Sequence, residues 1–128
     1  MVVFGAIYHW YPKVSGRFMS EKLGRLHFWP SLVFMNLLFG PMMLQGMAGF
    51  HRRWYDGGMA FEDTTRDLLW MNELMSFAAW GLALAQIPFI INLFISWKTG
   101  RKVESDNPWN ATTLEWATPT PPGHGNFT

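Results

Sequence analysis

Two long stretches without a single charged residue constrain the fold of this chain more than any other feature. No Asp, Glu, Lys or Arg occurs between Leu26 and His51, or between Leu74 and Trp97. A bilayer core about 30 Å thick needs about 20 helical residues, so each stretch is long enough to cross it. Two buried helices of a water-soluble protein are the alternative, but charge-free runs of this length are typical of membrane spans. The pattern predicts an all-α membrane protein with transmembrane helices at 26–51 and 70–98.

The composition supports a membrane protein and excludes several functional classes. The chain is 15% charged and 49% hydrophobic, with eight Trp, eleven Phe and nine Met, whereas soluble domains are about one quarter charged. A small soluble domain could not bury so much apolar surface. The net charge of +1 gives no electrostatic case for binding nucleic acid. The absence of cysteine excludes disulfides, thiolate metal sites and cysteine nucleophiles.

The segments around the two predicted spans complete the expected organisation. Residues 1–12 are apolar but too few to cross a bilayer, so we expect the C-terminal half of a transmembrane helix whose other half is missing or lies in another chain. Residues 13–25 then form an inner loop and residues 52–69 an outer loop. The polar, proline-rich tail at 99–128 is expected to run extended over the surface of a partner.

The distribution of basic residues predicts the orientation. Three basic residues lie between the spans, at Arg52, Arg53 and Arg66. Seven flank the other side of the membrane, and they are Lys13, Arg17, Lys22, Arg25, Lys98, Arg101 and Lys102. Because positive charge accumulates on the inner side, the connecting loop is expected outside and the C-terminus inside.

Polar and small residues inside the spans indicate contacts with protein. Polar side chains at that depth usually face other helices rather than lipid, and they are Asn36, Gln45, Gln86 and Asn92. Asn36 and Gly40 are one turn apart, as are Gly81 and Ala85, and this spacing permits close helix packing. We expect packing contacts, with the lining of a buried cofactor as the sharper alternative.

Histidines and arginines are the candidate binding residues. The four histidines are His9, His27, His51 and His124, and no two stand at i, i+4 on one helix. No metal site is therefore expected within this chain, and His9 and His27 are expected to form interfacial hydrogen bonds. Arg52 and Arg53 are either interfacial anchors or a site for an anionic partner, because guanidinium groups hold carboxylates bidentately.

Four stretches resemble the C-terminal part of subunit I of the haem–copper terminal oxidases, the cytochrome c oxidase family. Ile7 to Arg17 (IYHWYPKVSGR) is similar to the end of the family's tenth helix, and Leu23 to Trp29 (LGRLHFW) to the start of the eleventh. Asn36 to Gly46, followed by His51-Arg52-Arg53, resembles the eleventh helix and the twin-arginine loop. The tail strings NPWNATTLEW and PPGHGNF resemble the end of bacterial-type subunit I and are highly specific.

The resemblance implies a function and a set of partners. It implies a part of the catalytic subunit of an oxidase that transfers electrons from cytochrome c or a similar donor to O2 and pumps protons. Arg52 and Arg53 would hold haem propionates, and Phe39 would lie against the low-spin haem. The iron and copper ligands would lie in an N-terminal chain of subunit I, so this chain would contact haem but bind no metal. Lipid and oxidase subunits II and III would be the other partners, in a bacterial plasma membrane or a mitochondrial inner membrane.

The sequence also departs from the family pattern. His51 replaces the usual proline before the arginine pair, and Met42 and Met43 follow Pro41 where a histidine is usual. Two hypotheses follow: one half of a split subunit I, or a diverged two-helix accessory or assembly subunit without haem contact. The retained arginines and tail favour the split subunit.

Overall fold

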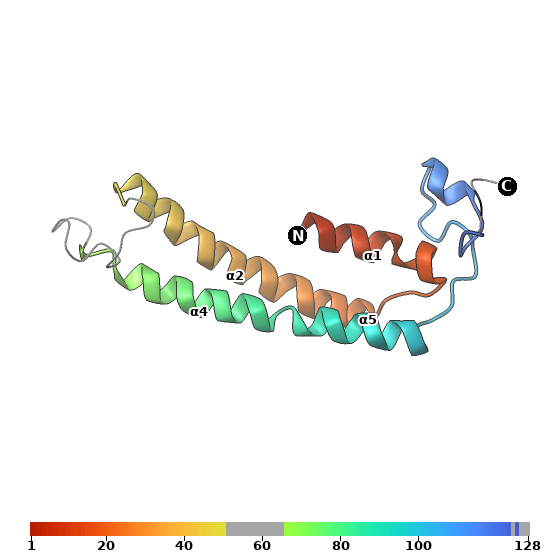
Figure 1. Cartoon of the computed structure of the whole chain (residues 1–128), viewed down its shortest axis with the longest axis horizontal. Coiled ribbons are helices and arrows are strands. Elements are labelled where there is room, and N and C mark those ends of the chain that lie inside the picture. Colours follow the sequence, from red (N-terminus) through yellow and green to blue (C-terminus); the bar gives the residue numbers. More distant parts are fainter. Residues whose placement is uncertain (51–65, 124, 126–128) are drawn as a thin grey trace. The chain divides into compact units, whose positions relative to one another are not determined.

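The computed structural model describes residues 1–50, 66–123 and 125. These residues form helices and connecting segments but no strand, apart from one isolated bridge between Arg17 and Lys102. The elements are α1 (Val2–Ser15), α2 (Glu21–Met47), α4 (Trp70–Leu84), α5 (Ile87–Thr99) and a 3-10 helix, η1 (Leu114–Ala117) (Figure 1). They divide into two units, 1–25 with 88–128 and 26–87. The predicted helical class is confirmed.

Helix α1 extends three residues beyond the apolar segment expected at 1–12. It passes through Pro12 and ends where Gly16 adopts a left-handed conformation (φ 68°), with the Gly16 N–H donating to the Pro12 carbonyl at 2.9 Å. Glycine suits this position because it has no Cβ to clash in the left-handed region. The hydroxyl of Ser15 also donates to the Tyr11 carbonyl at 2.7 Å. Lys13, expected in a loop, therefore belongs to the last turn of a helix.

Helix α2 begins five residues before the charge-free stretch. Its first turn carries Glu21, whose carboxylate pairs with Arg25 at 2.5 Å on an exposed surface. An acidic residue here suits the positive end of the helix dipole. Pro30 therefore lies inside the helix, and α2 continues through both Pro30 and Pro41 to Met47.

A proline inside the second predicted span predicts a kink, and the boundary between α4 and α5 lies beside Pro88. Pro88 has no N–H to donate to the carbonyl of Leu84, so the helical hydrogen-bond ladder is interrupted. The Gln86 N–H donates to the Ala83 carbonyl at 3.1 Å, and the Gln86 side-chain amide donates to the Leu82 carbonyl at 2.9 Å. Taken together, Trp70–Thr99 is the one helix in the described part of the chain that is long and apolar enough to cross a membrane. Membrane crossing by α2 stays a prediction.

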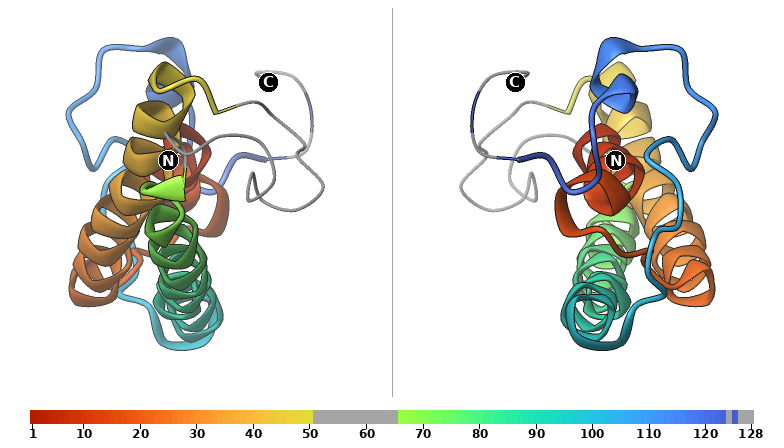
Figure 2. Two further views of the ribbon diagram at one scale, coloured as in Figure 1. Left: turned by 90° about the vertical axis from the view of Figure 1, so that its left-hand side faces the viewer. Right: turned by 90° about the vertical axis from the view of Figure 1, so that its right-hand side faces the viewer.

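Within the unit 26–87, α2 and α4 lie side by side and run antiparallel (Figures 1 and 2). Small residues of α4 allow this approach, with Ala78 only 2% exposed. A Cβ placed on Gly81 would lie 2.4 Å from the ring of Phe34 on α2. The close packing predicted from the Gly81–Ala85 spacing is therefore confirmed.

Within the unit 1–25 and 88–128, α1 packs on α5 through aromatic rings. The rings of Phe4 and Phe89 lie edge to face with centroids 4.9 Å apart, and Tyr8 meets Phe89 at 5.7 Å. The buried amide of Asn92 is bonded twice to Ser20, accepting from its N–H at 2.8 Å and donating to its carbonyl at 2.9 Å. These contacts join α1, the start of α2 and α5 into one structure.

Replacing Gly81 by alanine should weaken the α2–α4 contact, because the added methyl group must displace the Phe34 ring. Overpacking of this kind costs about 1–3 kcal/mol. Gly40→Ala is the matched control, since a Cβ there meets nothing within 4 Å. Denaturant titration of the chain in detergent, followed by circular dichroism, should show a loss for the first variant only. Equal stability of the two variants would contradict the close contact.

Candidate functional site

A chain of polar side chains links α2 to the end of α4. His27, which is only 2% exposed, places its Nε2 3.0 Å from Oε1 of Gln86. The Gln86 amide nitrogen also lies 3.2 Å from the fully buried hydroxyl of Ser31. The predicted hydrogen bond of His27 is present, while its location at the membrane interface stays a prediction. These bonds hold one face of α2 against α4 and engage a ring nitrogen of His27.

A second polar contact fixes the other end of the same helix pair. The side-chain amide of Gln45 donates to the Leu68 carbonyl at 2.9 Å and to Oδ1 of Asn72 at 3.0 Å. Gln45 is 4% exposed, as expected for a polar residue that faces protein rather than lipid. The two contacts are 18 residues apart on α2, which is five full turns, so they define one face of the helix.

The opposite face of α2 is open. Asn36 is nine residues beyond His27, which places it about half a turn away from the face that contacts α4. Its amide donates to the Leu32 carbonyl of its own helix at 2.8 Å. Gly40 has open space where a side chain would stand, and Met43 is 68% exposed. Within the unit 26–87, the described contacts of Asn36 and Gly40 are confined to α2 itself, so the helix packing expected from their spacing stays a prediction.

Phe39 borders this open face. Its side chain is 51% exposed, between the open face and the face that packs on α4. The ring is thus available to an apolar partner from outside the chain.

Arg52 and Arg53, the other two residues predicted for the site, lie outside the described residues, as do His51 and His124. Their roles stay predictions.

The histidines and carboxylates of the described segments do not gather. No group of three or more His, Cys, Asp or Glu that could hold a metal ion occurs within them. His9 lies in an aromatic cluster, its ring stacked 6.1 Å from Trp109 and edge to face with Trp116 at 5.2 Å. The carbonyl of His9 accepts a hydrogen bond from Nε1 of Trp109 at 2.9 Å.

A buried lysine fixes the C-terminal tail to α1, a contact that the sequence did not lead us to expect. Lys13 is 5% exposed, and its ammonium group donates to the carbonyls of Asp106 (3.3 Å) and Thr118 and to the Thr120 hydroxyl (3.0 Å). It also lies over the ring of Trp116, 5.6 Å from the centroid. Three acceptors satisfy all three ammonium donors, so this charge is buried without a carboxylate partner.

The turn that carries Trp116 has its own stabilising contact. Hydrogen bonds from its own backbone N–H and then from the Thr113 hydroxyl hold the pKa of the Glu115 carboxyl below its ordinary value. The Thr118 hydroxyl donates to the Glu115 carbonyl at 2.9 Å, which closes η1. The tail therefore folds back on this chain, although we expected it to extend over a partner.

Comparison with known proteins places these elements in context. Residues 1–95 match the family described as cytochrome C and quinol oxidase polypeptide I. The chain is 46% identical to an alternative cytochrome c oxidase subunit 1 of Bradyrhizobium diazoefficiens, over 99% of its own length and 21% of the relative's. It is 44% identical to cytochrome c oxidase subunit 1 of Synechocystis sp., over 98% and 21%. The chain thus spans about a fifth of the length of the curated relatives that it matches.

Replacing Lys13 by methionine should release the tail. The variant keeps the apolar stem but leaves two backbone carbonyls and a hydroxyl without their charged donor, and hydrogen bonds to charged groups contribute about 1.5–3 kcal/mol each. Chymotryptic cleavage after the buried Trp116 should become at least about tenfold faster. Lys102→Met is the control, because this exposed lysine makes only a backbone bridge. Unchanged cleavage in Lys13→Met would show that other contacts hold the tail.

The Glu115 turn should loosen at acid pH. A carboxyl whose folded pKa is depressed contributes stability that is present above its unfolded pKa and is lost as the pH falls through the folded pKa. The protection factors of the Trp116 and Ala117 amides, which correct for the pH dependence of intrinsic exchange, should therefore fall as the pH drops below the ordinary glutamate range. Glu115→Gln should remove this extra pH dependence. A variant with the wild-type profile would assign the effect to another group.

Proposed function

Because the chain belongs to the polypeptide I family of cytochrome c and quinol oxidases, we propose that it forms the C-terminal, haem-facing part of subunit I of a terminal oxidase. The observation that carries the proposal is the match over residues 1–95. In this role the chain contributes to an enzyme that transfers electrons from cytochrome c or a similar donor to O2 and pumps protons. Oxidase subunits II and III are its further partners.

The open face of α2 suits a flat, apolar group. Phe39 offers a half-exposed ring, and Gly40 leaves the backbone accessible beside it. Gly40 lies away from the surface that α2 uses to contact α4, and Phe39, at the border of that surface, still has half of its side chain exposed. Haem, when bound, supplies the redox-active iron. Phe39 lies against its edge in this proposal, while the ligands of iron and copper come from the rest of subunit I.

Arg52 and Arg53 hold the haem propionates in this proposal. A buried carboxylate without a partner is costly, and paired guanidinium groups bind carboxylates bidentately. The fixed positive charge also disfavours the oxidised iron, which carries one more positive charge than the reduced iron. The two arginines therefore raise the reduction potential of the haem as well as neutralising the propionates.

The exposed apolar residues of the helices are covered by other helices of subunit I and by lipid. On α1, Val2 is 88% and Val14 72% exposed, and on α2, Met47 is 74% exposed. Surfaces of this kind are covered by protein or lipid in a folded assembly. The seven-to-three distribution of basic residues supports an orientation with the C-terminus on the inner side of the membrane. The membrane is a bacterial plasma membrane or a mitochondrial inner membrane.

A diverged accessory or assembly subunit is the second candidate. His51 before the arginine pair and Met42 and Met43 after Pro41 favour it, because they depart from the pattern of the catalytic subunit. In that role, the open face of α2 contacts another helix and the arginines are interfacial anchors. The two candidates differ in whether Arg52 and Arg53 affect the haem.

Arg52→Gln and Arg53→Gln should each lower the midpoint potential of the low-spin haem, with haem still bound. A screened charge interaction of roughly 1 kcal/mol corresponds to some tens of millivolts, since about 59 mV is about 1.4 kcal/mol for one electron. Lysine at either position should give a smaller shift, because it keeps the charge but loses the bidentate geometry. Spectroscopic redox titration of the purified complex measures these shifts.

Arg66→Gln is the control, since it removes a charge from the same predicted outer loop. Its midpoint potential should stay at the wild-type value. Unchanged midpoints in both glutamine variants at the arginine pair would assign the chain to the accessory class. A shift equal in all three variants would indicate a general surface charge effect.

A further inference from the structure

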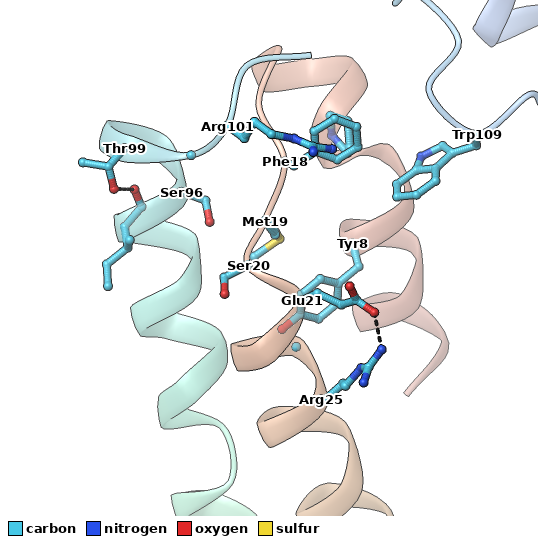
Figure 3. A pocket seen from close by; sticks show the side chains of 14 residues that line it. Tyr8, Phe18, Met19, Ser20, Glu21, Arg25, Ser96, Thr99, Arg101 and Trp109 are labelled. Carbon is cyan, nitrogen blue, oxygen red and sulfur yellow. Dashed lines mark hydrogen bonds and ion pairs between the residues drawn. The ribbon is translucent and has the colours of Figure 1, made fainter. Parts of the chain in front are cut away.

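A cavity of about 800 Å³ lies within the unit 1–25 and 88–128. Its walls come from α1, the segment from Phe18 to Arg25, the end of α5 and the tail (Figure 3). Gly100 shapes this wall, because a Cβ there would lie 2.4 Å from the Ser96 carbonyl and 2.8 Å from the Phe18 carbonyl. The backbone at Gly100 therefore lies close to that of Phe18, which brings the next residue, Arg101, to the cavity wall.

The lining of this cavity is amphipathic. Tyr8, Met19 and Ile95 give it an apolar wall, and Ser20 and Thr99 add hydroxyl-bearing residues. Trp109 closes another side, held by its hydrogen bond to the His9 carbonyl and by an edge-to-face contact with Phe18 at 5.6 Å. A ligand that fits this lining has a long apolar portion and a polar portion.

Arg101 supplies a cation without an anionic partner in the described part of the chain. Its guanidinium lies over the ring of Phe18, 4.8 Å from the centroid, and none of the described residues accepts a hydrogen bond from it or pairs with it. Arg25, the other basic residue of the lining, is already paired with Glu21 (Figure 3). The ring contact fixes the orientation of the Arg101 guanidinium and leaves its N–H donors available.

The position of Arg101 in the chain matches the level of lipid headgroups. The apolar run of α5 ends at Trp97, and Lys98, Arg101 and Lys102 follow within five residues. Tryptophan and basic residues are enriched where a span meets the headgroup region, and basic segments attract anionic lipids. This step rests on the membrane placement given under the proposed function, but not on contact with haem.

We propose that the cavity binds an anionic phospholipid, with its phosphate on the guanidinium of Arg101. The acyl chain lies along the apolar wall formed by Tyr8, Met19 and Ile95. Arg101 is suited to this role because guanidinium groups bind phosphate bidentately. Free phosphate shares the anionic chemistry but leaves the apolar wall without a partner, so the apolar lining favours the lipid.

The test compares bound phosphatidylglycerol in wild type and in Arg101→Gln. The complex is purified in mild detergent through a tag on this chain, exposed to phosphatidylglycerol or phosphatidylcholine, and analysed by native mass spectrometry. We expect Arg101→Gln to lower the affinity for phosphatidylglycerol about tenfold, which corresponds to about 1.4 kcal/mol. Arg101→Lys should lose less. Phosphatidylcholine should bind more weakly than phosphatidylglycerol to the wild type and about equally to both proteins.

Lys102→Gln is the matched control, because it removes the neighbouring charge without altering the cavity lining. Equal losses in both glutamine variants would overturn the proposal in favour of nonspecific attraction to a basic surface. Displacement of the lipid by millimolar inorganic phosphate would also overturn it, since the site would then bind the anion alone. Haem content and subunit composition, measured in the same samples, show separately whether the proposed oxidase function holds. The same lipid measurement on the full chain in nanodiscs tests the cavity if no haem-containing complex forms.

Discussion

Buried polar side chains in apolar helices must find partners inside the protein, and this requirement organises both units of the chain. A hydrogen-bonding group without a partner is costly to place in hydrocarbon. His27 and Ser31 meet Gln86, while Gln45 meets Asn72. In the other unit, Asn92 occupies both backbone groups of Ser20. Each pairing fixes the rotation of a helix about its own axis, because an apolar contact alone would tolerate many rotations.

Fixing the rotation of α2 has a functional consequence. Once His27, Ser31 and Gln45 face α4, Asn36 and Gly40 necessarily lie on the other side, and Phe39 lies at its border. That side is open within the unit 26–87, and it is the side on which the proposed function places a haem or another helix of subunit I. The polar contacts thus decide which surface is available to a partner without contacting the partner themselves.

The tail shows a different use of charge. Lys13 has no carboxylate partner, and carbonyl and hydroxyl oxygens of the tail surround it instead. A buried ammonium group is tolerated only when its donors are satisfied, so its burial selects one conformation of a segment that otherwise has few apolar anchors. Trp116, 2% exposed, supplies the main apolar contact and lies against the same lysine. The folded tail and the aromatic cluster around His9 in turn position Trp109 at the cavity proposed to bind lipid.

Local sequence patterns predict the helical class, the apolar run at 70–98, the disruption near Pro88, the close contact at Gly81 and the family resemblance. These features follow from local rules. They are the hydropathy of a continuous stretch of residues, the missing N–H of proline, the missing side chain of glycine, and short sequence motifs that are specific to the family. The folded structure was needed to show that Lys13 lies in a helix and binds the tail, that Asn92 meets Ser20, and that Arg101 lies over Phe18. These contacts join residues more than 70 positions apart, and the energy of such a contact depends on which groups the fold brings together. No local pattern records that choice, because a lysine beside a proline looks the same whether its ammonium group meets water or three backbone and hydroxyl oxygens.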